Sequence, residues 1–174
     1  MEDSLRGKLL IAAPSLFDFF RRAVVLVVEH SEEGAFGLVL NRASETPVGE
    51  VLPALADLAG PEEPVRVGGP VATESVVVLG RFEDPSRSPK IIAGDLGVVD
   101  PADTDAVVRA RIYAGHSGWA GGQLESEMER DAWLVEDATP EDPFLADDMW
   151  AVALQRRGGE YALLATMPED PSLN

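Results

Sequence analysis

Gly115-His116-Ser117-Gly118 is the stretch of this sequence nearest to a catalytic motif. A nucleophile elbow has the pattern Gly-x-Ser-x-Gly on a strand-to-helix turn, which exposes the serine hydroxyl. Here Trp119 occupies the final glycine position, and the histidine is the direct neighbour of the serine. Adjacent side chains on a turn seldom form the hydrogen bond that activates a nucleophile. The stretch is therefore predicted to be a glycine-rich turn whose tryptophan packs on the core, in preference to a catalytic triad.

A binding site is the alternative use of this turn. The glycines precede a predicted helix over 123–130, and the free N–H groups at a helix start can hold an anion. Three glutamates of that helix already complement its dipole, which weakens the case for a phosphate ligand. The candidate ligand-binding residues here are Gly118, Trp119 and Gln123.

Glu29-His30 and Asn41-Arg42 form a second candidate site, because each pair follows a predicted buried strand. Functionally, the Arg42 guanidinium could clamp a carboxylate or phosphate through two parallel hydrogen bonds. Structurally, Asn41 would serve a turn and Arg42 would pair with Glu29 across a hairpin, and this interpretation is favoured. In either case we expect the four residues to lie near one another at one edge of the domain.

Gly68-Gly69-Pro70 predicts a sharp connection between strands that needs unusual backbone angles. The alternative is a wall along which a ligand approaches the backbone, and Gly69 is the candidate residue for that role.

The sequence lacks the residues that most metal and cofactor sites require. It contains no cysteine and only two histidines. It has no Gly-x-Gly-x-x-Gly, Walker A or His-Glu-x-x-His pattern, and its aspartates lack the glycine and distal glutamate of an EF-hand. We therefore expect no catalytic residue set, no metal and no cofactor.

The charge balance excludes several kinds of partner. Aspartate and glutamate outnumber lysine and arginine by 31 to 14, which gives a net charge of −17. Gripping nucleic-acid phosphates requires a basic surface, so we expect no direct nucleic-acid binding and no adhesion to anionic membranes. Ten acids and one base lie between Glu125 and Asp148. This run predicts a solvated face, with a basic protein partner or loosely bound divalent cations as alternatives.

No apolar run approaches the roughly 18 residues of a membrane span, and the acidic start of the chain lacks the apolar segment of a signal peptide. These features predict a cytoplasmic protein. The length of 174 residues predicts a single domain over 1–174, with its core at about 5–157 and a loose tail at about 168–174.

Strands and helices alternate without a regular βαβ period. The β-branched run 23–28 predicts a strand buried on both faces. A second apolar run at 35–40 follows a turn, so residues 23–40 are predicted to form a hairpin. Further strands are predicted near residues 7–13, 65–67, 76–79, 91–99, 107–114 and 133–135. Helical spacing and capping residues predict one helix from Thr46 to Leu58, kinked or delayed by Pro53, and another from Asp142 to Arg157. Asp100-Pro101 is predicted to open a short helix. This mixture favours an α+β fold.

Several segments together resemble the YqgE/AlgH family, a family of uncharacterised proteins and a domain of unknown function. The matching segments, in order, are Gly7-Lys8-Leu9-Leu10-Ile11-Ala12-Ala13-Pro14, Phe20-Arg21-Arg22-Ala23-Val24-Val25-Leu26, Glu29-His30, Gly34-Ala35-Phe36-Gly37-Leu38-Val39-Leu40-Asn41-Arg42, Gly68-Gly69-Pro70-Val71, Gly118-Trp119, Gly122-Gln123-Leu124-Glu125 and Trp133-Leu134. The resemblance covers about residues 5–157. The sequence departs from the family pattern at Ala43, usually a proline, and at His116 and Ser117, often a tyrosine and a small residue.

The resemblance implies an α+β domain with a mixed, partly barrel-like sheet flanked by helices. It implies no established enzymatic activity, although one branch is named for a regulator of alginate production. The leading hypothesis is a non-enzymatic protein that binds a protein partner or a small ligand and acts indirectly in transcriptional regulation. The alternatives are an enzyme with a pocket between the Gly118-Trp119/Gln123 turn and Asn41-Arg42, and a structural or assembly module.

Overall fold

The computed structural model describes residues 4–13, 20–145 and 149–164, and the predicted tail at 168–174 lies outside them. The described residues form ten strands that divide into two sheets joined by one shared strand. The first sheet has the order β10 (Trp133–Asp137), β1 (Lys8–Ala12), β2 (Val24–Ser31), β3 (Gly34–Val39) and β9 (Val107–Ala120). The second sheet contains β4 (Ala43–Pro47), β5 (Pro64–Val67), β9, β6 (Val71–Phe82), β8 (Leu96–Val98) and β7 (Lys90–Ala93).

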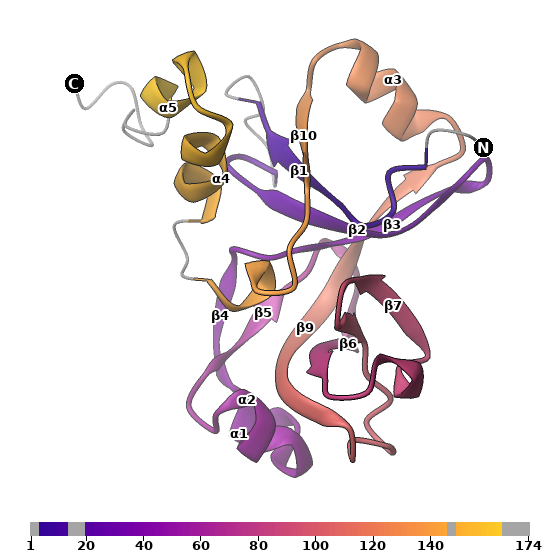
Figure 1. Cartoon of the computed structure of the whole chain (residues 1–174), viewed down its shortest axis with the longest axis vertical. Coiled ribbons are helices and arrows are strands. Elements are labelled where there is room, and N and C mark those ends of the chain that lie inside the picture. Colours follow the sequence, from indigo (N-terminus) through magenta and orange to yellow (C-terminus); the bar gives the residue numbers. More distant parts are fainter. Residues whose placement is uncertain (1–3, 14–19, 146–148, 165–174) are drawn as a thin grey trace.

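Strand β9 belongs to both sheets. Its first half pairs with β6 and, in parallel, with β5. Its last residues, Ser117 to Ala120, pair with β3. Between the two halves lies Gly115, whose φ of 74° is accessible mainly to glycine. Figure 1 shows β9 rising from the lower sheet into the upper one.

The helices are short and cover the outer surfaces of the two sheets (Figure 1). The described helical elements are α1 (Val48–Val51), η1 (Pro53–Leu55), α2 (Ala56–Ala59), η2 (Pro85–Arg87), α3 (Gln123–Glu129), η3 (Asp142–Phe144), α4 (Met149–Arg157) and α5 (Glu160–Leu164). The α+β class with a sheet flanked by helices is confirmed, and the parallel β5–β9 pair makes the sheet mixed.

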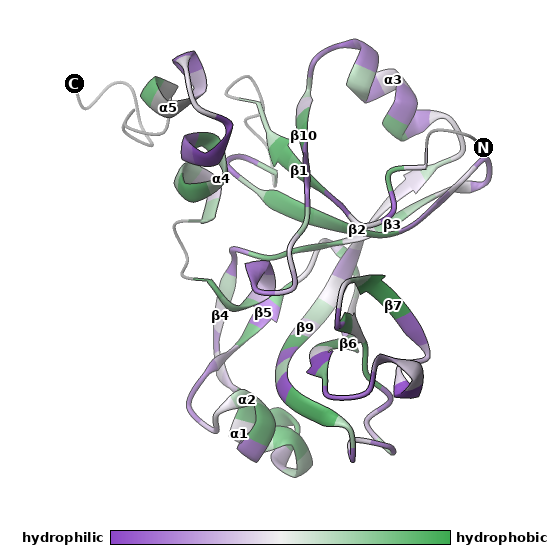
Figure 2. Ribbon diagram, viewed as in Figure 1, coloured by the Kyte–Doolittle hydropathy of each residue, from purple (hydrophilic) through white to green (hydrophobic). Residues whose placement is uncertain are grey.

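Strand β2 is buried on both faces, as its lack of polar alternation predicted. Val24, Leu26 and Val28 pack in one apolar core together with α4 and part of the second sheet. Val25 and Val27 pack in a second core on the opposite face, under α3. Figure 2 shows the resulting hydrophobic colour along β1 and β2. A third core lies between the second sheet and α1, η1 and α2.

Three predicted elements differ from the structure. The predicted turn at 115–122 is wrong, because hydrogen bonding to β3 extends strand β9 to Ala120. The predicted helix from Thr46 is wrong at its start: residues to Pro47 form β4, and the helix then breaks at Pro53, which lacks an N–H group. Residues 100–103 form a turn in place of the short helix predicted at Asp100-Pro101.

The predicted helix from Asp142 begins later. A short η3 covers Asp142–Phe144, and α4 begins at Met149. The Asp142 carboxylate accepts hydrogen bonds from the N–H and hydroxyl of Thr139 and pairs with Arg156 at 2.8 Å. It therefore closes the preceding turn and ties it to α4.

The loop after β5 packs against β9 with almost no space between the two backbones. A Cβ atom at Gly69 would lie 2.1 Å from the carbonyl carbon and oxygen of His116, and one at Gly68 would lie 2.4 Å from the carbonyl oxygen of Gly115. The Gly68 carbonyl accepts hydrogen bonds from the Val39 N–H at 2.8 Å and from the Ser117 hydroxyl at 3.1 Å. This seam joins β3, β5 and β9 where the sheets meet.

Replacing Gly69 by alanine should strongly destabilise the protein, because backbone atoms of His116 cannot move aside as a flexible side chain can. We expect the free energy of unfolding to fall by about 2–3 kcal/mol or more. Gly118→Ala is the matched control on β9, since nothing lies within 4 Å of the new Cβ, and its effect should stay within about 0.5 kcal/mol. Urea unfolding measures both variants. Equal effects of the two substitutions would contradict the close packing at this seam.

Candidate functional site

Glu29-His30 and Asn41-Arg42 lie at opposite ends of the β2–β3 hairpin, so the prediction that they meet at one edge is wrong. His30 is opposite Ala35 near the hairpin turn, whereas Val25 is opposite Val39 at the other end. In an antiparallel hairpin the end of the first strand lies beside the start of the second, not beside its end. A combined site of these four residues therefore does not form.

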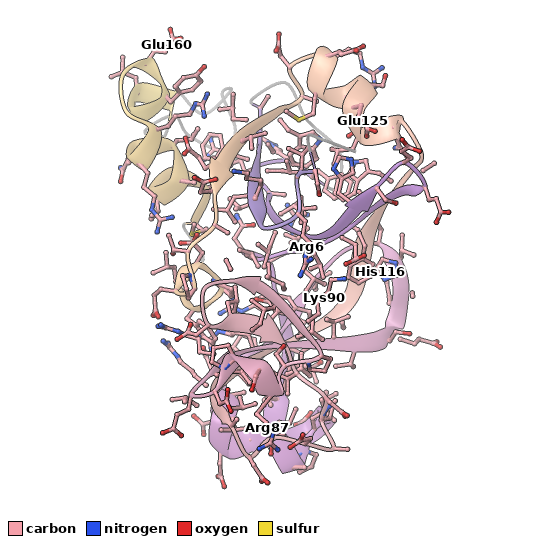
Figure 3. All side chains as sticks on the ribbon, turned by 45° about the vertical axis from the view of Figure 1, so that its right-hand side comes forward. Arg6, Arg87, Lys90, His116, Glu125 and Glu160 are labelled. Carbon is pink, nitrogen blue, oxygen red and sulfur yellow. The ribbon has the colours of Figure 1, made fainter. Side chains whose placement is uncertain are left out.

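Glu29 and His30 are adjacent on β2 and bind partners on opposite sides of it. Glu29 pairs with Lys90 of β7, so that it links the two sheets. The His30 ring accepts a hydrogen bond from the Leu5 N–H at Nδ1 (2.9 Å), which leaves Nε2 to donate to Glu125 (3.2 Å). Figure 3 shows Glu125 and Lys90 on opposite sides of the β2–β3 ribbon. Both side chains thus connect elements of the fold.

Asn41 and Arg42 stabilise the connection that precedes β2. The Asn41 side chain accepts from the Val24 N–H at 3.0 Å and donates to the Arg22 carbonyl at 2.9 Å. The Arg42 guanidinium donates to the Arg21 carbonyl at 2.8 Å. The predicted pairing of Arg42 with Glu29 is wrong, whereas the structural role predicted for Asn41 fits these contacts.

Ser117 and His116 do not form a nucleophile and base. The Ser117 side chain is fully buried and donates to the Gly68 carbonyl. The His116 ring stacks on Phe36, with 4.5 Å between ring centroids. The space that a side chain at Gly69 would fill is occupied by the His116 backbone, which is why this position requires glycine.

Trp119 and Gln123 converge on one carboxylate, that of Glu127 on α3. Glu127 Oε1 accepts hydrogen bonds from the indole N–H groups of Trp119 (3.0 Å) and Trp133 (2.9 Å). Gln123 donates to Glu127 Oε2 at 3.1 Å and accepts from the Ala120 N–H at 3.0 Å. The predicted packing of Trp119 on the core is confirmed, and the Glu127 carboxylate anchors α3 over two buried indoles.

The described acids of the run from Glu125 differ in exposure, since Asp142 is buried whereas Glu129, Asp131 and Asp137 are exposed, and Asp147 and Asp148 lie outside the described residues. Six of its acids have intramolecular partners within the described residues. These partners are His30 for Glu125, the two indoles for Glu127, Arg157 for Glu136, Lys8 for Asp137, Arg81 and Arg109 for Glu141, and Arg156 for Asp142. The run therefore holds β10, α3 and η3 to the rest of the molecule.

Four arginines lie on one face of the second sheet, and we call them the arginine row: Arg66, Arg111, Arg109 and Arg81. Arg109, Arg111 and Tyr113 are each two residues apart along β9 and so share a face. Directly opposed residues also share a face, and Arg81 is opposite Arg109 while Arg66 is opposite Tyr113.

Three carboxylates bind the row. Glu63 Oε1 contacts Arg111 at 2.9 Å and Arg66 at 4.0 Å. Asp95 accepts two hydrogen bonds from Arg81, at 3.0 and 3.1 Å, which raise the pKa of that guanidinium. Glu141 bridges the exposed end of the row, with its two oxygens 2.9 Å from Arg81 and 2.8 Å from Arg109.

Phe144 covers the middle of the row. Its ring lies 4.4 Å from the guanidinium carbon of Arg109 and 5.3 Å from that of Arg111. Such cation–π contacts are worth about 0.5–2 kcal/mol each, more when water is excluded. The segment 139–145, which carries Glu141 and Phe144, therefore forms a strap across the arginine row.

The two ends of the row differ in exposure. At the open end, Arg81 and Arg109 line a pocket of about 610 Å³ together with Phe82, Glu83, Asp95 and Val108. At the closed end, the Arg111 side chain is only 9% exposed and Tyr113 is fully buried. Burial lowers the pKa of Arg111, which Glu63 opposes, and burial raises the pKa of the Tyr113 hydroxyl.

A second pocket, of about 570 Å³, lies near the β2–β3 turn and is lined by Ser4, His30, Ser31, Glu32 and Glu33. Neither pocket is lined by Asn41, Arg42, Trp119 or Gln123, the residues between which an enzymatic pocket was expected.

Within the described part of the chain, no three histidine, aspartate or glutamate side chains group as a metal site. No helix among the described residues is both long and apolar enough to span a bilayer.

Sequence reasoning missed the arginine row, although part of its signal was present. Arg109 and Arg111 sit two residues apart in a strand that was correctly predicted, so they had to share a face. Arg66 and Arg81 come from other strands, and only the pairing of β5 and β6 with β9 places them beside that pair.

Comparison with known proteins gives consistent matches. The family model described as DUF179, AlgH-like, matches residues 9–162. A UPF0301 protein of Streptomyces coelicolor is 43% identical over 98% of this chain and 96% of its own length. A UPF0301 protein of Mycobacteroides abscessus is 42% identical over 97% of this chain and 87% of its own length.

Two solved structures share the fold. A crystal structure of a Corynebacterium diphtheriae protein has a TM-score of 0.86 at 31% identity and covers 95% of this chain and 93% of its own. The solution structure of the AlgH protein from Pseudomonas aeruginosa has a TM-score of 0.72 at 31% identity and covers 97% and 96% of the two chains.

Removing the Glu127 carboxylate should leave two buried indole N–H groups without an acceptor. Each unsatisfied buried donor costs about 1–3 kcal/mol, so Glu127→Ala should lower the free energy of unfolding by about 2 kcal/mol or more. Glu129→Ala, on the exposed side of the same helix, controls for the change in helix propensity and should have little effect. Denaturant unfolding followed by tryptophan fluorescence compares them. Similar losses in both variants would show that the indole contacts contribute no stability.

Proposed function

This chain belongs to the AlgH-like family, and from that premise we propose that it is a non-enzymatic binding protein whose ligand is a small polar molecule with an acidic group. The arginine row carries the proposal. In a chain with 31 acids and 14 bases, four arginines share one face of one sheet, and this row ends in a pocket.

The open end of the row suits a ligand that carries both kinds of polar group. Arg81 and Arg109 contribute guanidinium donors, and Glu83 and Asp95 contribute acceptors on the same pocket. A carboxylate or phosphate would bind the arginines in the manner of Glu141, while hydroxyl or amino groups of the ligand would bind the acids. Phe82 and Val108 add apolar surface, as is usual in small-molecule sites.

Three of the polar side chains considered as site residues already have structural partners. Ser117 binds the Gly68 carbonyl, His30 links Leu5 to Glu125, and Gln123 holds Glu127. A general base must reach the proton that it removes, and these contacts occupy the groups that would do so. This supports binding in preference to an enzymatic reaction.

Direct binding of nucleic acid is not part of the proposal. Phosphate backbones require a continuous basic surface, whereas Arg66 and Arg111 are buried and the pocket at Arg81 and Arg109 also carries Glu83 and Asp95. We propose that any influence on transcription is indirect, through a protein that senses the ligand-bound state, and that the protein works in the cytoplasm.

Citrate, which carries carboxylates and a hydroxyl, is a suitable first probe for the pocket. We expect citrate to bind the wild-type protein, and Arg109→Gln to weaken this binding by about tenfold or more, because a charge-assisted hydrogen bond is lost. Arg87→Gln is the matched control, since Arg87 forms a half-exposed ion pair with Asp103 and does not line the pocket. Isothermal titration calorimetry measures both affinities.

An equal loss of citrate affinity in the Arg109 and Arg87 variants would show that citrate binds through general charge. No citrate binding by the wild-type protein, at concentrations up to tens of millimolar, would exclude carboxylate recognition at this pocket.

A further inference from the structure

The Tyr113 hydroxyl and the Arg111 Nε–H are buried at the closed end of the arginine row and have no hydrogen-bond partner among the described residues. Tyr113 is fully buried, and the Arg111 side chain is 9% exposed. Leaving a buried donor unsatisfied costs about 1–3 kcal/mol, and more for a charged group. Buried donors in native proteins therefore usually have a hydrogen-bond partner.

The Arg111 guanidinium makes two other contacts. Nη2 contacts the Glu63 carboxylate at 2.9 Å, and the Phe144 ring lies 5.3 Å from the guanidinium carbon. These contacts fix the orientation of the planar group. Its Nε–H has no hydrogen-bond acceptor among the described residues and can donate to a ligand.

Tyr113 and Arg111 project from the same face of β9, two residues apart. That spacing corresponds to about 6.6 Å along a strand. Both unpartnered atoms can donate a hydrogen bond: Nε–H is a donor only, and the phenolic hydroxyl is a donor as well as an acceptor. Burial raises the pKa of Tyr113, which keeps the hydroxyl protonated. The group that satisfies both atoms must therefore offer acceptors.

We propose that Arg111 and Tyr113 form an inner subsite for an oxyanion, a carboxylate or phosphate group, at the closed end of the arginine row. This inference rests on the proposed function, because it adds a second oxyanion position, at the inner end of the same row, to the outer one at Arg81 and Arg109. Arg111 supplies a fixed cationic donor and Tyr113 supplies a neutral one. Tyr113 belongs to the same apolar core as Leu79, Phe144 and Met149, and low polarity strengthens hydrogen bonds made inside it.

The subsite makes Tyr113→Phe an informative variant. Without a ligand, removing an unsatisfied buried hydroxyl should leave the stability unchanged or higher. With an oxyanion bound, the same substitution should remove part of the ligand's stabilising effect. A purely structural role for Tyr113 predicts only the first of these results.

Inorganic phosphate is the probe, compared with chloride at equal ionic strength. We expect saturating phosphate to raise the Tm of the wild-type protein by about 3 °C or more. Tyr113→Phe should reduce this rise to less than half. Tyr161→Phe is the matched control, because Tyr161 on α5 is the other tyrosine of the chain, and it should keep the full response.

A second readout follows the hydroxyl-bearing carbon of tyrosine by NMR in protein labelled with ¹³C-tyrosine. The two tyrosines give two such signals, which the two variants assign. Phosphate should shift the Tyr113 signal and leave the Tyr161 signal in place. An unshifted Tyr113 signal, or equal Tm responses in the two variants, would overturn the subsite, and an internal water would then be the partner of both atoms.

These results also separate the subsite from the proposed function. If Arg109→Gln weakens citrate binding while Tyr113→Phe leaves the phosphate response intact, the outer pocket binds the ligand and the inner subsite is refuted. If phosphate acts through Tyr113 while citrate does not depend on Arg109, the inner subsite is supported and the outer pocket is refuted.

Discussion

Both sheets of this protein depend on one strand, because β9 must pair with β5 and β6 through its first half and with β3 through its end. Where β9 changes partners, another backbone passes very close to it. Gly68, Gly69 and Gly115 make that passage possible, since a side chain at any of them would meet backbone atoms within 2.1–2.5 Å. The seam also separates two parts of β9. Ser117 is buried after Gly115, and the arginine row lies on the half of the strand before Gly115.

The acidic composition has a structural use that the net charge alone conceals. Many of the acids pair with the few bases across element boundaries, as Glu29 does with Lys90, Glu63 with Arg111 and Asp142 with Arg156. Exposed ion pairs contribute little individually. Those at the arginine row are different, because Phe144 and the strap exclude water from part of the row. Where water is excluded, burying the Tyr113 hydroxyl without a hydrogen bond costs free energy, and a ligand that accepts this hydrogen bond would remove the cost.

Much of the fold was predictable from local pattern, and much of the site was not. The β2–β3 hairpin follows from a β-branched run and a second apolar run on either side of Ser31–Gly34, and α3 follows from its helical spacing. The turn predicted at Gly115–Gly122 failed because glycine in a strand can allow close approach of another backbone as well as a turn. The pairing predicted for Glu29 and Arg42 failed because it ignored the direction of the hairpin. The arginine row depends on strand order, which no local window contains.

The central claim is that the arginine row binds the acidic group of a small ligand, and the arginine Nε–H signals test it most directly. In ¹⁵N-arginine-labelled protein, assigned by single Arg→Lys substitutions, citrate and phosphate should shift the Nε–H signals of Arg81, Arg109 and Arg111. The signal of Arg87, which pairs with Asp103 and does not line the pocket, should remain in place. Shifts of similar size at all of these arginines, or at none of them, would contradict the account.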